Sequence, residues 1–298
     1  MIPKAGDAID VRGLAKRYGR VQALEDLTLQ VAEGEIFGFL GPNGSGKTTT
    51  IRLLLGLLRP TAGSASLLGE PITRASVASR RDVGYLPGEL ALWPGFSGHA
   101  TLEFLERLTG RPASDRVSLL ERLGLSDAEL RRPVRTYSDG MKQKLGIVQS
   151  LQCRPRLAFL DEPTKGLDPL VQRAFYDILE TARGRGTTVF FSSHILPEVQ
   201  RVCDRVAILR AGRLVTVGAI EDVRRAQRRR VRAAFTTATD TAHLDRFGEI
   251  RSRTPIDIEM LVAQETLPGL VSLLAAMPLV DITIEPPSLE DAFLGFYQ

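Results

Sequence analysis

Apolar and polar residues alternate over the first forty positions in runs that are typical of β-strands. The runs read AIDVRGLA, LEDLTLQV and EIFGFL, with turn-forming residues between them. After the last run the pattern changes to a glycine-rich loop and the helical segment KTTTIRLLLGLL. Apolar residues three and four positions apart then predict helices over about 89–150, as in TLEFLERL and VSLLERLGL.

Two strongly apolar runs follow and predict buried strands. They are LAFL at 157–160 and TTVFFSS at 187–193, and the helical pattern PLVQRAFYDILETARG separates them. Strands that alternate with helices form parallel sheets with crossover helices, so we expect an α/β fold. A β pair in RVAILRAGRLVTVG closes this region near 218.

The pattern changes again near residue 220, where we place a domain boundary. The arginine-rich stretch VRRAQRRRVR at 223–232 is predicted to be a connecting helix. Beyond it, VRAAFTT, IDIEMLVA and VDITIEP predict strands, LPGLVSLLAAM a helix, and SLEDAFLGFY the last segment. The expected organisation is a domain over 1–220, with its helical part at about 89–150, and a small α+β domain over 221–298.

Composition adds limits on location and partners. With 43% hydrophobic and 25% charged residues, the chain has the balance of a soluble globular protein. Its apolar stretches, such as LVSLLAAM at 270–277, are shorter than the roughly 20 residues that span a bilayer. The start of the chain also lacks the pattern of a leader. We therefore expect a cytoplasmic protein that reaches a membrane only through a partner.

The basic excess is local. The net charge is +4, and the stretch 223–232 alone holds six arginines. Such a run is more often a solvated surface or linker than a nucleic-acid patch, so no nucleic acid is expected as a partner. Cys153 and Cys203 lie in apolar surroundings without ligand spacing, and we interpret them as reduced core residues.

The stretch GPNGSGKT at 41–48 carries the first clear chemistry. It matches the pattern G-x-x-x-x-G-K-[ST] between an apolar strand and a helix, which is the context that a phosphate-binding loop requires. Lys47 should reach the β- and γ-phosphates, and the hydroxyl of Thr48 should bind Mg²⁺. The alternative is a glycine-rich turn that binds nothing. The residues predicted to contact nucleotide are Gly41, Pro42, Asn43, Gly44, Ser45, Gly46, Lys47, Thr48 and Thr49.

Polar residues follow both buried strands. Asp161 and Glu162 end the first, and the carboxyl ends of parallel strands face the ligand crevice. Asp161 is therefore predicted to hold Mg²⁺, and Glu162 to act as the general base for the attacking water. The alternative for such a pair is a plain solvent-facing strand end. His194 follows the second strand on the same edge and is predicted to reach the γ-phosphate and the water.

The stretch YSDGMKQKL at 137–145 predicts a second anion site. A serine hydroxyl and a glycine N–H at a helix N-terminus can bind a phosphate, and Ser138 and Gly140 supply both. A P-loop GTPase or kinase would leave Ser138, Gly140 and His194 without roles.

This constellation over 8–218 resembles the ATP-binding subunits of ABC transporters. Their signature motif, LSGGQ, corresponds to YSDGM here, and Ser138 and Gly140 are the matching residues. The resemblance implies an ABC-type P-loop NTPase with a β-subdomain and a helical insert. It also implies a head-to-tail dimer that hydrolyses two MgATP.

The same resemblance assigns further residues. Tyr18 in KRYG matches the aromatic residue that stacks on adenine, Asp168 the loop that crosses the dimer interface, and His194 the switch histidine. The chain departs from the family after GYLP, where Gly88 and then Glu89 stand in place of the usual glutamine.

The ending ITIEPPSLEDAFLGFY looks like the extension of drug-exporter ATPases of the daunorubicin-resistance type. It implies a subunit at the cytoplasmic face of the membrane that powers export through a separate permease, with the helical insert docked on that permease. Two alternatives stay open. One is a soluble ABC-superfamily ATPase that acts on nucleic acid or the ribosome, and the other is an importer ATPase.

Overall fold

The structure, a computed structural model, describes residues 6–73, 80–225 and 228–285. The chain forms two compact units, Met1–Gly218 and Ala219–Gln298, and each is described by itself. The segment SLEDAFLGFY, which we expected to be the last element, lies outside the described residues.

A six-stranded sheet forms the centre of the first unit, with the strand order β10-β9-β3-β8-β7-β6. Strand β3 pairs in parallel with β8 and β9, and β7 pairs in parallel with β6 and β8. The carboxyl ends of β3, β7 and β8 therefore meet at one edge of the sheet. The strands are β3 (Ile36–Leu40), β6 (Val83–Leu86), β7 (Leu157–Asp161), β8 (Thr188–Ser193), β9 (Arg205–Arg210) and β10 (Arg213–Ala219).

A second, antiparallel sheet in this unit has the order β2-β1-β4-β5. Its strands are β1 (Asp7–Tyr18), β2 (Val21–Ala32), β4 (Ala62–Leu67) and β5 (Glu70–Pro71). Strands β1 and β2 have 12 residues each, longer than the runs that the sequence predicts. Several register shifts between them interrupt the apolar alternation and hide the full length of both strands.

Helices cover the central sheet, and aromatic residues fill its core. Strand β3 leads into α1 (Lys47–Leu54), and β7 and β8 are joined by α7 (Pro169–Gly184); α8 (Leu196–Val202) follows β8. Phe39 and Phe159 both pack on Phe190 of the strand between them, with ring centroids 5.0 and 5.4 Å apart. This layer is fully buried and fixes the strand ends that carry the polar residues.

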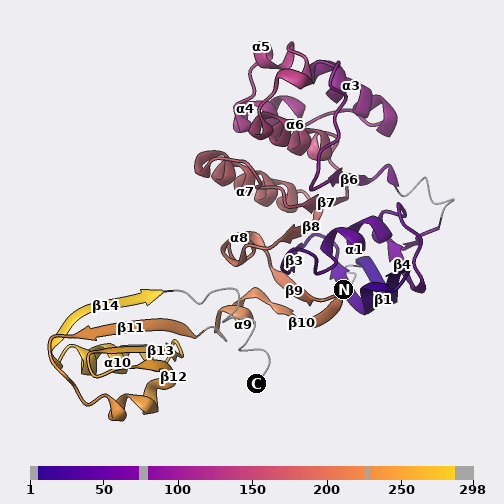
Figure 1. Cartoon of the computed structure of the whole chain (residues 1–298). Coiled ribbons are helices and arrows are strands. Elements are labelled where there is room, and N and C mark those ends of the chain that lie inside the picture. Colours follow the sequence, from indigo (N-terminus) through magenta and orange to yellow (C-terminus); the bar gives the residue numbers. More distant parts are fainter. Residues whose placement is uncertain (1–5, 74–79, 226–227, 286–298) are drawn as a thin grey trace, which may run out of the picture. The chain divides into compact units, whose positions relative to one another are not determined.

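The helical insert lies between β6 and β7 in sequence. Figure 1 shows its helices gathered at one end of the first unit, beyond α7 and the edge strand β6. It consists of α3 (Gly98–Thr109), α4 (Arg116–Leu123), α5 (Asp127–Leu130), the 3-10 helix η1 (Val134–Thr136) and α6 (Asp139–Leu151). Helix α6 approaches β6 so closely that a Cβ at Gly84 would lie 2.0 Å from the carbonyl oxygen of Ser150.

The second unit is a four-stranded antiparallel sheet with helices on one face. Its order is β12-β13-β11-β14, and Leu244, Leu270 and Leu274 pack on the buried face of the strands. The elements are α9 (Ile220–Arg225), β11 (Arg229–Phe235), η2 (Ala242–Phe247), β12 (Gly248–Arg253), β13 (Asp257–Val262), α10 (Leu267–Leu274) and β14 (Leu279–Glu285).

The prediction of one connecting helix over 223–232 is wrong in its second half. Helix α9 ends at Arg225, and β11 begins at Arg229. Val231 and Ala233 are buried, whereas Arg232 between them is exposed, which is the two-residue period of a strand. The concentration of arginines obscured this alternation.

The described ranges contain no helix with both the length and the apolar character needed to cross a bilayer.

Candidate nucleotide-binding site

The loop between β3 and α1 encloses a cavity of about 180 Å³. Gly46 caps α1 at a φ of 109°, a backbone conformation that favours glycine, and the cap has no side-chain hydrogen bond. The first backbone bond of the helix runs from the N–H of Thr50 to the oxygen of Gly46 (2.9 Å), so the N–H groups of Lys47, Thr48 and Thr49 are left for a ligand. The hydroxyl of Ser45 is also buried without a partner among the described residues. The predicted cradle 41–48 therefore has the form of an anion site.

Lys47 is held under this loop. Its Nζ donates to the oxygens of Gly41 (2.7 Å) and Pro42 (3.2 Å) and lies 3.8 Å from Oε1 of Glu162. The side chain is only 5% exposed, and this burial lowers the pKa of Lys47, although Glu162 and Asp161 act in the opposite direction. A phosphate would supply the negative charge that favours the ammonium form.

Asp161 ends β7 and is 1% exposed. Its Oδ2 accepts a hydrogen bond of 2.8 Å from the hydroxyl of Thr48, and its Oδ1 accepts one from Ser192 on β8. The two predicted metal ligands are therefore already in contact. Their hard oxygen atoms suit Mg²⁺, which is bound by one or two protein ligands together with phosphates and water. The described residues hold no group of three or more His, Cys, Asp or Glu side chains arranged for a metal.

Glu162 and His194 face each other across β7 and β8. His194 Nδ1 lies 3.1 Å from Glu162 Oε1, and the N–H of Glu162 donates to the oxygen of Ser192 (3.1 Å). Glu162 also lines the cradle cavity and has a φ of 49°, in the left-handed region that non-glycine residues adopt at a cost. Its carboxylate is therefore placed between Lys47 and His194.

Gly88 lies beside the same acid. A Cβ at this position would be 3.3 Å from Oδ2 of Asp161, so a longer side chain here would reach the predicted metal ligands. Glu89, the next residue, is exposed. The departure from the family pattern therefore removes a side chain next to Asp161.

Ser138 and Gly140 lie at the start of α6. Ser138 caps the helix through a hydrogen bond from the N–H of Met141 to its hydroxyl (3.2 Å). A Cβ at Gly140 would lie 2.9 Å from the oxygen of Gly166, so close packing inside this chain also requires glycine there. From the next turn, Gln143 donates to the oxygen of Pro163 (2.8 Å) and connects α6 to the loop after Glu162.

The remaining two predicted residues also lie at element ends. Asp168 caps α7 by accepting from the N–H groups of Leu170 and Val171, and these bonds lower its pKa. Tyr18 ends β1 with 45% of its surface exposed, and Lys16 lies 5.0 Å from its ring centroid.

The structure thus joins part of the predicted site directly. Lys47 and His194 both contact Glu162, and Thr48 bonds Asp161; the hydroxyl of Ser192 donates to Asp161 and accepts from the N–H of Glu162, which connects the two groups. No hydrogen bond or ion pair in the described ranges joins Ser138, Asp168 or Tyr18 to them. Sequence reasoning missed Ser192 and Gln143. Ser192 could have been found from the two serines that end the strand before His194. No sequence pattern pointed to Gln143.

Comparison with known families gives two matches. A model described as "ABC transporter" matches residues 24–165, and one described as "EvrA-like ABC transporter, C-terminal domain" matches residues 227–285. An uncharacterized ABC transporter ATP-binding protein of Bacillus subtilis, YhcH, is 32% identical over 96% of this chain and 94% of its own length. The chain belongs to the ABC transporter ATP-binding family.

Relatives in this ABC family include proteins named for resistance or export. The daunorubicin resistance ATP-binding protein DrrA3 of Streptomyces coeruleorubidus is 41% identical over 74% of this chain and 71% of its own. The Nod factor export ATP-binding protein I of Cupriavidus pinatubonensis is 35% identical, over 74% and 69%. The resemblance stated from the sequence is confirmed.

Solved structures agree with the fold. An ATP-binding subunit of an ABC transporter superposes with a TM-score of 0.68 at 32% identity, covering 73% of this chain and 92% of that one. A dimeric bacterial ABC transporter cassette superposes with a TM-score of 0.66 at 22% identity, over 71% and 98%. The expected P-loop fold of the ABC ATPase type is confirmed. The ABC domain binds ATP, and ATP hydrolysis is the characteristic activity of such cassettes.

Proposed function

We propose that this chain is the ATP-hydrolysing subunit of an exporter, that it pairs with a second copy around two MgATP, and that it drives a separate permease. It would lie at the cytoplasmic face of the membrane through that permease. The observation that carries the proposal is the set of contacts among Lys47, Thr48, Asp161, Glu162 and His194 at one sheet edge.

Each side chain has a distinct task in this proposal. Lys47 and the N–H groups of the cradle bind the phosphates of ATP. Thr48 and Asp161 would hold Mg²⁺, which supplies charge neutralisation at the phosphates when it is bound. Glu162 accepts a proton from the attacking water, and His194 keeps that carboxylate and the water oriented. Lys47 lies near Glu162, so a phosphate bound to Lys47 would weaken the attraction between the ammonium group and the Glu162 carboxylate.

The position of Ser138 supports dimerisation. The residue caps α6 in the same chain, and no bond within the described residues connects it to the cradle. The N-terminus of α6 therefore supplies an anion site for the γ-phosphate of a second subunit's ATP. ATP would bind the closed pair more tightly than the open one and so shift the equilibrium toward closure, which hydrolysis reverses.

The surface of the helical insert supports a membrane-protein partner. Trp93, Phe96 and Phe104 are each about 40% exposed and pack together, with the Trp93 ring 5.0 Å from that of Phe104 and 5.6 Å from that of Phe96. Grouped exposed aromatic side chains are typical of protein interfaces. We propose that an apolar helix face of the permease docks on this aromatic cluster.

The names of the relatives favour export over import, because they refer to drug resistance and to Nod factor export. The match of residues 227–285 to the C-terminal domain of EvrA-like ABC transporters supports an accessory role for the second unit.

Replacing Glu162 by Gln tests the catalytic part of the proposal. The variant should hydrolyse ATP about 10²–10⁴-fold more slowly, because a general base contributes a factor of that size. It should also form a dimer when ATP is added, which sedimentation velocity can detect. Glu180→Gln, an exposed acid on α7, is the control and should behave like the unchanged chain. Normal hydrolysis by Glu162→Gln would show that another group is the base.

A further inference from the structure

A cavity of about 120 Å³ lies between α4 and α7 and shares no lining residue with the nucleotide cradle. It is strongly basic. Four arginines line it, together with a single acidic residue, Asp115, so the lining has a net charge of three positive units. The arginines are Arg122, Arg154, Arg156 and Arg185.

Two of these arginines have a structural explanation. Arg154 and Arg185 follow the C-terminal ends of α6 and α7, where a positive charge is favourable. They bind opposite oxygens of Asp115, Arg154 through Nη2 to Oδ1 and Arg185 through Nη1 to Oδ2, both at 2.6 Å. The Asp115 carboxylate therefore forms an ion pair with both guanidinium groups.

Arg122 and Arg156 pair with no acidic residue of the cavity lining. Nη1 of Arg122 donates to the neutral hydroxyl of Thr181 (3.2 Å), and Nη2 of Arg156 donates to Glu33 (3.0 Å), a partly exposed residue outside the cavity lining. A guanidinium has five N–H donors, so both arginines keep donors for a ligand. An anion in the cavity would offset the positive charge that remains on the four arginines beside the carboxylates of Asp115 and Glu33.

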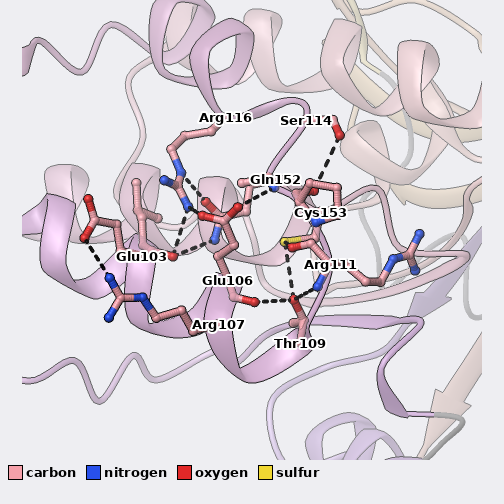
Figure 2. A network of polar contacts seen from close by, with 12 residues as sticks. Glu103, Glu106, Arg107, Thr109, Arg111, Ser114, Arg116, Gln152 and Cys153 are labelled. Atoms are coloured by element: carbon pink, nitrogen blue, oxygen red, sulfur yellow. Dashed lines mark hydrogen bonds and ion pairs between the residues drawn. The ribbon is translucent and has the colours of Figure 1, made fainter.

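The wall that carries Asp115 is held in place by a polar network at the start of α4. Figure 2 shows the guanidinium of Arg116 between Glu106 of α3 and Gln152 after α6. The N–H of Ala113 donates to Glu106 (2.9 Å), which lowers the pKa of that carboxyl, and the N–H of Asp115 donates to the oxygen of Gln152 (3.1 Å). The cavity is therefore preorganised, which reduces the cost of binding.

We propose that this cavity binds a small phosphate-bearing anion through Arg122 and Arg156. Arg154 and Arg185 add to the positive electrostatic potential in the cavity. The volume limits the ligand to about one phosphate group with a short substituent. Arginine forms strong charge-assisted hydrogen bonds with phosphate oxygens, and its planar fork matches their geometry. The anion would connect α4 of the helical insert with α7 beside the central sheet.

Calorimetric titration of the full chain tests this site. Lys47→Ala is introduced first, to weaken phosphate binding in the cradle, and inorganic phosphate and glycerol phosphate are titrated separately at constant ionic strength. We expect saturable binding of one anion per chain. In the same background, Arg122→Gln with Arg156→Gln should reduce the affinity at least tenfold. Arg107→Gln, an exposed arginine of α3 paired with Glu103, should leave it unchanged.

The titrations distinguish a free phosphate ion from a phosphate ester as the ligand. Binding of inorganic phosphate indicates a free ion as the ligand, and binding of glycerol phosphate alone indicates a phosphate ester. No saturable binding of either anion overturns the proposal. An affinity that is insensitive to the double change, or that falls equally with Arg107→Gln, also overturns it. Circular dichroism of each variant confirms that a lost affinity does not reflect unfolding.

Discussion

Ser138 has two tasks that a single substitution can separate. Its hydroxyl caps α6 within the chain, and in the proposed dimer the same hydroxyl contacts a phosphate of the partner's ATP. Gly140 likewise combines the proposed contact with a packing requirement against Gly166. Residues of this kind are hard to interpret from activity loss alone, because destabilisation and loss of the phosphate contact both reduce turnover.

Ser138→Gly distinguishes the two tasks. Glycine replaces serine at an N-cap at a cost of only a few tenths of a kcal/mol. Loss of a hydrogen bond to a charged phosphate costs about 1.5–3 kcal/mol, so ATP-induced dimerisation should weaken at least tenfold. The measurement is sedimentation of the Glu162→Gln chain with and without this change.

The control is Ser126→Gly, which removes the serine that caps α5. It should change stability by a similar small amount and leave dimerisation intact. Equal dimerisation by both glycine variants would remove Ser138 from the proposed interface.

At the scale of elements, helix α6 of the helical insert packs closely on β6 of the central sheet. Gly84 leaves no room for a side chain opposite Ser150, although its φ is negative and suits any residue. Ser138 caps α6, and β6 leads to Gly88 beside Asp161. This packing therefore holds Ser138 and Gly88 in place relative to the sheet.

Gly84→Ala should therefore destabilise the chain by about 1–3 kcal/mol through overpacking. Gly184→Ala is the matched control, because a Cβ there meets nothing within 4 Å and the residue ends α7. The control should be neutral or stabilising by up to about 1 kcal/mol. Urea denaturation followed by circular dichroism measures both, and equal midpoints would contradict the packing argument.

The elements also show what the sequence can and cannot predict. The motif at 41–48, the strand-end acids and the helix 169–184 were evident because each has a local pattern. The contact of Thr48 with Asp161 followed from a rule on parallel strands, since the two residues are far apart in sequence. Gln143, the antiparallel strand β12 and the length of β1 depended on tertiary partners, which no local pattern reports. The helix predicted over 223–232 was wrong in its second half because arginine occurs in both helices and strands.

At the scale of the molecule, the charges distinguish the candidate partners. In the basic run, Arg228 pairs with Glu249, and Arg230 and Arg232 both pair with Glu259. Two carboxylates thus offset part of the charge of these three arginines, which weakens their attraction for a phosphate backbone. The exposed aromatic cluster of Trp93, Phe96 and Phe104 favours a protein partner instead.

Trp93→Ser together with Phe104→Ser should abolish co-purification of the chain with the proposed permease, because buried aromatic anchors dominate binding energy at interfaces. ATP binding should be unaffected, since neither residue lines the cradle. Val117→Ser, which changes an apolar residue of α4 that is 69% exposed, is the control. Undiminished co-purification of the double variant would place the docking surface elsewhere.

The left-handed backbone at Glu162 has a practical consequence for engineering. Glycine at this position would relieve about 1–2 kcal/mol of strain and also delete the proposed base. A selection for thermal stability alone would therefore enrich variants with glycine at position 162, which are more stable and are expected to be inactive. Directed evolution of this chain needs a turnover screen in every round.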